Sequence, residues 1–272
     1  MTKEIKTYIV DAFTDEPFKG NQAGVCVLSN KLSDKEMLAI AKELGFSETA
    51  YVIPKKKSGE YIIRFFSPKM EIPLCGHATL AAAKVMFNDQ PSLTKICFET
   101  MEGRELPIAM IEDKIAMDFP VFSTVPYLTE PKLLAALGLE EVSSSHYNIE
   151  TKIILLEIDD SAQLEQMAPD FQKLVKSHAD INGVLVTTRS ERKGFDFESR
   201  YFWPWSGTNE DPVTGATHTF LTEFWGRRLG KRKMRSFQCS ERTGFMEVEL
   251  MENGTVCIKG DAIVILSGVL AL

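Results

Sequence analysis

The stretch Arg64-Phe65-Phe66-Ser67-Pro68, with Cys75-Gly76-His77-Ala78-Thr79 beginning seven residues after its proline, has a second copy in this chain. The second copy is Arg200-Tyr201-Phe202-Trp203-Pro204, and Asp211-Pro212-Val213-Thr214-Gly215 begins seven residues after that proline. This count aligns Cys75 with Asp211. A side chain that can carry a proton is therefore expected in each copy, at the point where a loop turns into a helix. Two such loops predict one shared site.

The repeat extends beyond these loops, because Gly103 and Gly244 are each followed by two strand-like segments. Residues 80–87 are apolar on nearly every face, which predicts a helix enclosed by a curled sheet. We therefore predict an α+β fold of two pseudo-symmetric domains, each a curled, mostly antiparallel sheet wrapped around a central helix. Prolines at positions 120, 126 and 131 break regular structure between the copies. The predicted domains are 1–120 with the C-terminal strand 262–272, and 121–261.

The composition is that of an ordinary globular protein. A chain of 272 residues that is 44% hydrophobic can fill one large or two medium cores. Its net charge of −7 disfavours non-specific binding to nucleic acid. Five cysteines without CxxC spacing argue against a disulfide framework and against a zinc site. The first residues lack a secretory signal and the longest apolar run is too short to span a bilayer, so we expect a cytoplasmic protein with no membrane partner.

The glycine loops predict an anion site. A helix N-terminus offers unpaired backbone N–H groups and the positive end of a dipole, and Gly76 and Gly215 allow a ligand to approach closely. A small carboxylate held from both sides would have its α-carbon between Cys75 and Asp211. Such a site suits removal and return of a proton at carbon, with no metal or organic cofactor. Two other interpretations stay open: Asp211 before Pro212 suits a helix N-cap, and Cys75 suits a buried small residue.

Glu48 lies in a strand-like segment between Phe46 and Tyr51. It is interpreted as a surface strand residue, as a capping partner, or as a buried acid whose pKa is raised toward neutrality and which exchanges protons. His77 is a functional candidate because it lies inside the glycine-containing loop. The other histidines, at positions 146, 178 and 218, have no such context.

Several motifs, in chain order and spread over almost the whole chain, resemble the phenazine-biosynthesis PhzF-like family: Asp11-Ala-Phe-Thr with Gly20-Asn21, Phe46-Ser-Glu-Thr, Gly76-His-Ala-Thr, Glu210-Asp-Pro-Val-Thr-Gly and Gln238-Cys-Ser-Glu-Arg-Thr-Gly244. The family has the diaminopimelate epimerase fold, with two pseudo-symmetric domains and the active site between them. In the phenazine isomerase, the glutamate of the Ser-Glu motif shuttles a proton during isomerisation of a dihydro-hydroxyanthranilate. The resemblance thus implies Glu48 as the acid/base, with His77 and Asp211 assisting. It also implies a substrate-binding set of Ser47, Gly76, Thr214, Gly215 and Ala216.

Departures from the family pattern leave the substrate open. Cys75 occupies the place of one catalytic cysteine of the epimerases, where the phenazine enzyme has none, and Asp211 is taken to stand at the second. Ala216 replaces a common serine, and Arg242-Thr243-Gly244 replaces Arg-Gly-Gly.

The sequence therefore predicts a cofactor-independent isomerase of a small carboxylate with no nucleic-acid partner. It does not fix the oligomeric state, but the resemblance implies a homodimer, because members of the family often form dimers. One alternative is an amino-acid-type racemase or epimerase that uses Cys75 and Asp211 as opposed bases. The other is a binding protein that has lost its chemistry.

Overall fold

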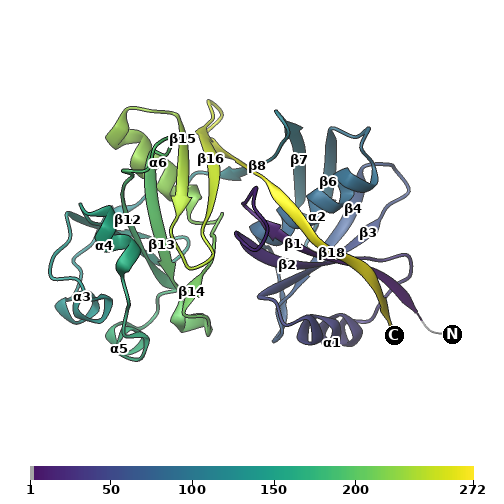
Figure 1. Cartoon of the computed structure of the whole chain (residues 1–272), viewed down its shortest axis with the longest axis horizontal. Helices are drawn as coiled ribbons and strands as arrows, with labels where there is room; N and C mark the ends of the chain where they lie inside the picture. Colours follow the sequence, from purple (N-terminus) through teal and green to yellow (C-terminus); the bar gives the residue numbers. More distant parts are fainter. Residues whose placement is uncertain (1–2) are drawn as a thin grey trace. The chain divides into compact units, whose positions relative to one another are not determined.

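The structure is a computed structural model that describes residues 3–272. The described chain folds into two compact units: unit 1 contains residues up to Asp118 together with Ile258–Leu272, and unit 2 runs from Phe119 to Cys257 (Figure 1). The expected joins, after residues 120 and 261, lie two and four residues beyond these boundaries. The C-terminal strand belongs to unit 1.

Unit 1 is a mixed sheet with two helices. Its elements are β1 (Glu4–Ala12), β2 (Asn21–Val27), α1 (Asp34–Leu44), β3 (Glu48–Pro54), β4 (Glu60–Phe66), β5 (Glu71–Ile72), α2 (Gly76–Asp89), β6 (Lys95–Glu99), β7 (Glu105–Ile111), β8 (Lys114–Pro120) and β18 (Ala262–Ala271). The strands pair in the order β18-β1-β2-β3-β4-β6-β7-β8. Only β2 with β3 and β4 with β6 run parallel among these pairs, so the unit is mostly antiparallel.

Helix α2 is the centre of unit 1. It packs against β1, β2, β3 and β18, and ten of its fourteen residues are buried. Its alanine-rich sequence favours the helix and keeps it thin enough for strands to approach from several sides. Gly260 shows how close this approach is, because a Cβ there would lie 2.7 Å from the Phe13 ring and 3.1 Å from Leu80 of α2. The enclosed central helix predicted from residues 80–87 is confirmed for this unit.

Unit 2 repeats this plan. Its elements are β9 (Val125–Pro126), α3 (Pro131–Leu137), β10 (Ser144–Asn148), β11 (Ile153–Glu157), α4 (Ser161–Gln166), α5 (Phe171–Ser177), β12 (Gly183–Arg189), β13 (Phe197–Phe202), the 3-10 turn η1 (Pro204–Ser206), β14 (Glu210–Asp211), α6 (His218–Leu229), β15 (Lys233–Gln238) and β16 (Gly244–Leu250), and β17 (Thr255–Gly260) returns the chain to unit 1. The pairing order is β9-β10-β11-β12-β13-β15-β16.

The pairing directions support the internal duplication. β11 runs parallel to β12 as β2 does to β3, and β13 runs parallel to β15 as β4 does to β6. The short β14 pairs with β13 as β5 pairs with β4, and a buried helix follows each short strand. The mixed α+β class is confirmed. Among residues 3–272, no helix combines the length and apolarity needed to cross a membrane.

The strand register corrects one prediction about the repeat. Phe66 pairs with Glu71, and Phe202 pairs with Glu210, so the second turn is three residues longer and contains η1. Gly76 comes five residues after its paired glutamate, and Gly215 comes five residues after its own. Cys75 therefore corresponds to Thr214, and the predicted alignment of Cys75 with Asp211 is wrong. Counting from the prolines assumed that both turns have the same length.

Candidate active site

Three side chains of unit 1 meet where β3 and α2 begin. Glu48 is the first residue of β3, Cys75 precedes α2, and His77 is its second residue. The Glu48 Oε2 lies 3.2 Å from His77 Nε2, and the Cys75 Sγ lies 3.5 Å from His77 Nδ1. Each of the three residues is only 8% exposed. The structure thus brings together, from segments 27 residues apart, three of the four predicted catalytic residues.

The pKa values of Glu48 and His77 shift in opposite directions within this cluster. Burial alone would raise the pKa of Glu48, but hydrogen bonding to His77 and its positive charge outweigh burial, and the pKa of Glu48 is lowered. Burial alone would lower the pKa of His77, but the Cys75 sulfur and the Glu48 carboxylate raise that pKa well above its usual value. At neutral pH the two therefore form a carboxylate–imidazolium pair. The interpretation of Glu48 as a buried acid is confirmed, but the expected upward shift of its pKa is wrong.

Cys75 is a thiol in this setting rather than a thiolate. Burial is the largest influence and raises the pKa of Cys75, although the neighbouring His77 and the backbone N–H of Ala78 act in the opposite direction. A helix N-terminus usually lowers a thiol pKa, and here that effect is outweighed by loss of water. Ser47, the predicted binding residue beside Glu48, has its Oγ 3.5 Å from His77 Nε2.

The first turn of α2 has no side-chain cap from its N-cap residue. Cys75 has extended backbone angles, and in the described chain its side chain makes no capping hydrogen bond to the helix. A Cβ added at Gly76 would meet no atom of residues 3–272 within 4 Å. The N-terminus of a fourteen-residue helix is therefore open beside the cluster, as an anion site requires.

In unit 2, Asp211, Thr214 and Gln238 form a second cluster. Thr214 Oγ1 donates to Asp211 Oδ2 at 2.5 Å. Gln238, at the end of β15, donates from Nε2 to the Asp211 carbonyl at 2.7 Å and accepts from the Thr214 N–H at 2.9 Å. The side-chain amide of Gln238 thus bonds to both ends of the segment from Asp211 to Thr214. Gln238 was part of the family motif but was not predicted as a site residue, because an uncharged amide at a strand end carries no sequence signal of chemistry.

Asp211 does not cap α6. The helix begins at His218 with Thr217 as its N-cap, and Asp211 lies in β14 opposite Tyr201. The capping interpretation of Asp211 is therefore wrong. The predicted binding residues Gly215 and Ala216 lie in the turn before the helix, where Gly215 is buried and Ala216 is exposed. His218 supports this turn, since its Nδ1 lies 3.0 Å from the Thr214 carbonyl and burial lowers its pKa to about 4.

Each loop is anchored by the same arginine–glutamate pair. In unit 1, Arg64 Nε and Nη2 donate to Glu71 at 2.7 and 2.6 Å, and the guanidinium lies 5.1 Å from the Phe66 ring centre. In unit 2, Arg200 makes the corresponding bonds to Glu210, both at 2.7 Å, with the Phe202 ring 5.0 Å away. Each pair ties a short strand to its neighbour and so sets where the following loop begins.

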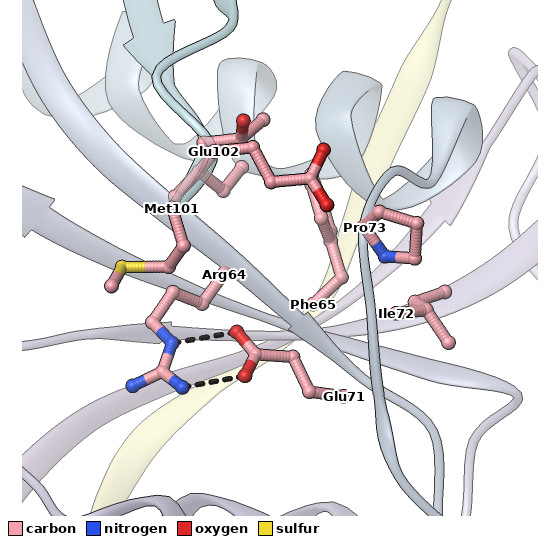
Figure 2. A pocket seen from close by; sticks show the side chains of 9 residues that line it. Arg64, Phe65, Glu71, Ile72, Pro73, Met101 and Glu102 are labelled. Atoms are coloured by element: carbon pink, nitrogen blue, oxygen red, sulfur yellow. Dashed lines mark hydrogen bonds and ion pairs between the residues drawn. The ribbon is translucent and has the colours of Figure 1, made fainter.

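A cavity of about 270 Å³ lies beside the first of these pairs (Figure 2). Arg64 and Glu71, joined by their two hydrogen bonds, form one part of its wall, and Pro73, Met101 and Glu102 form another. Glu48, Cys75 and His77 do not line it. The cavity therefore adjoins the anchor of the loop rather than the side chains that could move a proton.

Comparison with known proteins identifies the family of this chain. The model of the phenazine biosynthesis-like protein family, PhzC-PhzF, matches residues 10–268. The chain belongs to this family. An uncharacterized isomerase of Pseudomonas aeruginosa is 41% identical over 270 residues, which are 99% of this chain and 100% of that protein. The family membership and the isomerase class predicted from the motifs are confirmed.

Solved structures agree with this assignment. A PhzC/PhzF protein from Clostridium difficile superposes with a TM-score of 0.90 at 35% identity, covering 98% of this chain and 100% of that one. A hydroxyproline epimerase from Agrobacterium vitis, with bound trans-4-hydroxy-L-proline, reaches a TM-score of 0.61 at 10% identity, covering 99% and 93%. The second likeness concerns the fold alone, and it confirms the epimerase-type fold that the resemblance implied.

For a member of this family, the cluster in unit 1 offers a base and an acid in contact. Glu48 is an anion that can accept a proton, and His77 is a cation that can stabilise negative charge or return a proton. Cys75 as a thiol is a poor base at neutral pH. The arrangement therefore favours proton transfer centred on Glu48 over transfer centred on Cys75.

Proposed function

We propose that this protein is a cofactor-independent isomerase of a small carboxylated substrate, with Glu48 as the acid/base. The single observation that carries the proposal is the buried contact of 3.2 Å between Glu48 and His77. This contact keeps the carboxylate ionised in a site from which water is largely excluded. A desolvated carboxylate with a proton donor beside it is suited to remove a proton from carbon and to return it.

The proposed reaction is balanced without any co-reactant. The Glu48 carboxylate takes a proton from a carbon next to a carbonyl or double bond, and the C–H electron pair becomes an enolate-like charge. His77 and the N–H groups at the start of α2 stabilise that charge. The proton on Glu48 then passes to a different carbon, so that the double bond moves and the carboxylate is restored.

Unit 2 is proposed to assist through Asp211, with substrate contacts from Thr214, Gly215 and Ala216. The hydrogen bond from Thr214 to Asp211 supports this role because it holds the carboxylate in one orientation. Ser47 and Gly76 supply the contacts proposed in unit 1.

The alternative is a racemase or epimerase in which Cys75 and Asp211 act as opposed bases. The contact of 3.5 Å between Cys75 Sγ and His77 Nδ1 favours it, since a histidine can activate a thiol. The repeat argues against it, because the residue that corresponds to Cys75 is Thr214, and an alcohol is not a base at neutral pH. A binding protein without chemistry remains the third candidate, and catalytic exchange of a carbon-bound proton distinguishes it from both enzymes.

The test is proton exchange at carbon. A panel of small unsaturated carboxylates and amino acids is incubated in D₂O with each protein, and loss of C–H signals is followed by proton NMR. We expect exchange with the wild type and a fall of about 10²–10⁴-fold in Glu48→Gln, which keeps the shape but loses the base. Glu43→Gln, an exposed change in the same unit, is the matched control and should leave exchange unchanged.

Cys75→Ala separates the two enzyme mechanisms. Unchanged exchange in this variant, with a shifted double bond in the product, supports the Glu48 mechanism. Loss of exchange in Cys75→Ala, together with inversion at a chiral carbon by the wild type, supports the racemase. Full exchange activity in Glu48→Gln would refute the proposed function.

A further inference from the structure

The same three side chains present their donor atoms to one point. The ligand atoms of Glu48, Cys75 and His77 all lie within 4.8 Å of one another, and all three residues are buried. For the His77 Nε2, the separations are 3.2 Å to the Glu48 Oε2 and 3.9 Å to the Cys75 Sγ. The sulfur lies slightly nearer the other ring nitrogen, 3.5 Å from Nδ1, so the ring would have to turn for one nitrogen to face both groups.

These separations can be compared with those of a tetrahedral metal centre. With Zn–S of about 2.3 Å, and Zn–N and Zn–O of about 2.0–2.1 Å, tetrahedral angles require about 3.3 Å between N and O and about 3.6 Å between N and S. The observed N···O and N···S distances differ from these values by only a few tenths of an ångström. The O···S separation lies within 4.8 Å, where a tetrahedral centre requires about 3.6 Å, so the His77 ring and the Cys75 side chain would rotate to bring the three donors onto one ion.

We propose that Glu48, Cys75 and His77 form a binding site for zinc or a similar divalent cation, with three protein ligands and an open fourth position. The thiolate and the carboxylate would together neutralise the charge of the ion, and a neutral imidazole would complete a ligand set that suits zinc. The spacing rule applied to the cysteines missed this site because the ligands come from β3 and from the start of α2.

The sulfur is the feature that an acid/base pair does not require. Proton transfer between Glu48 and His77 needs only their mutual contact, whereas a third donor within reach of the same nitrogen completes a chelate. A bound ion would occupy the electron pairs that proton transfer uses, so the ion is an inhibitor and not a cofactor. The proposal goes beyond the isomerase function and does not depend on it, since its test is direct binding.

The test uses Co²⁺ as a spectroscopic probe on the full-length chain, free of other metals and with reduced cysteines. We expect one Co²⁺ per chain and a thiolate-to-cobalt charge-transfer band in the near ultraviolet. Zn²⁺ should abolish the band at equal concentration, because zinc binds such sites more tightly than cobalt. Cys75→Ser should lose the band and weaken binding by about a hundredfold or more, since changes outside the ligand set already cost about 10–100-fold.

Cys97→Ser is the matched control, because Cys97 lies in β6 of the same unit and outside the cluster. It should retain both the band and the affinity. If Cys75→Ser fails to fold, judged by circular dichroism, His77→Gln decides, because it keeps the sulfur and should still lose about a hundredfold in affinity. Absence of a thiolate band in the wild type, its persistence in Cys75→Ser, its loss in Cys97→Ser, or full affinity in His77→Gln would each overturn the proposal.

Discussion

Replacing the loop-anchoring arginine with methionine should have very different consequences in the two halves of the repeat. Arg200 and Glu210 are 10% and 17% exposed at their side chains. Beyond its paired bonds to Glu210, the Arg200 Nη1 donates to three backbone carbonyls at the end of α4, those of Leu164, Glu165 and Met167. Arg200→Met would leave a largely buried carboxylate without its cation and these carbonyls without their donor.

Arg64 has a similar geometry but more exposed partners. Its side chain is 11% exposed, while Glu71 is 36% exposed and Asp34 is 77% exposed. When Arg64 is lost, water can solvate both carboxylates. We expect Arg200→Met to lower the free energy of unfolding by about 3–5 kcal/mol, the usual cost of breaking a buried pair. Arg64→Met should cost about 1 kcal/mol, as for a solvated pair.

The measurement is urea unfolding of both variants. The three tryptophans, Trp203, Trp205 and Trp225, all lie in unit 2, so their fluorescence follows that unit while far-ultraviolet circular dichroism follows the whole chain. With a slope of about 2 kcal/mol per molar urea, the fluorescence midpoint should fall by about 2 M in Arg200→Met. The midpoint in Arg64→Met should fall by about 0.5 M by circular dichroism. An equal or larger loss in Arg64→Met would refute the reasoning from burial.

Three further predictions concern stability. Glu48 has a lowered pKa, so its contribution to stability is complete above the ordinary glutamate pKa and is lost as the pH falls through the pKa of Glu48 in the folded protein. His77 has a raised pKa, so its contribution is complete below the ordinary histidine pKa and is lost as the pH rises through the pKa of His77 in the folded protein. The stability difference between wild type and His77→Gln, measured from urea midpoints, should therefore be largest between the ordinary pKa of glutamate and that of histidine. A difference that does not depend on pH would contradict the ion pair. Ser33→Ala should cost about 1 kcal/mol in chemical unfolding by removing the capping box of α1, whereas Ser33→Thr should restore most of it. Gly183→Ala should cost about 1–3 kcal/mol by thermal unfolding, because its Cβ would lie 2.6 Å from the Tyr201 ring and 2.8 Å from the Phe202 backbone oxygen; an unchanged melting temperature would show that both neighbours can shift at little cost.

Much of the site was predictable because its signals are local. The glycine loops before helices at Gly76 and Gly215 follow from residue types over a few positions. The buried character of α2 follows from apolar residues on every face of one helix. His77 was recognised from its place in the loop, and Glu48 from the family motif.

Other features depended on distances that spacing does not encode. The three extra residues between β13 and β14 shift the register, so that Thr214, and not Asp211, corresponds to Cys75. The pKa of Glu48 was expected to rise because burial was the only influence visible in its neighbours, whereas His77, 29 positions away, reverses the direction. Gln238 joins Asp211 to Thr214 from a strand 24 positions further along the chain.

The sequence by itself determined the duplicated plan and the glycine loops, because helix termini, turns and apolar periodicity are set by neighbouring residues. It also determined the family, through motifs distributed along the chain. Only the tertiary structure decided which titratable side chains lie close enough to interact electrostatically. Sheet pairing brings β3 beside β2 and packs both against α2, and this places Glu48 against His77 and Cys75. Electrostatic energy depends on separation in space and on exclusion of water, and neither quantity can be obtained from separation along the chain.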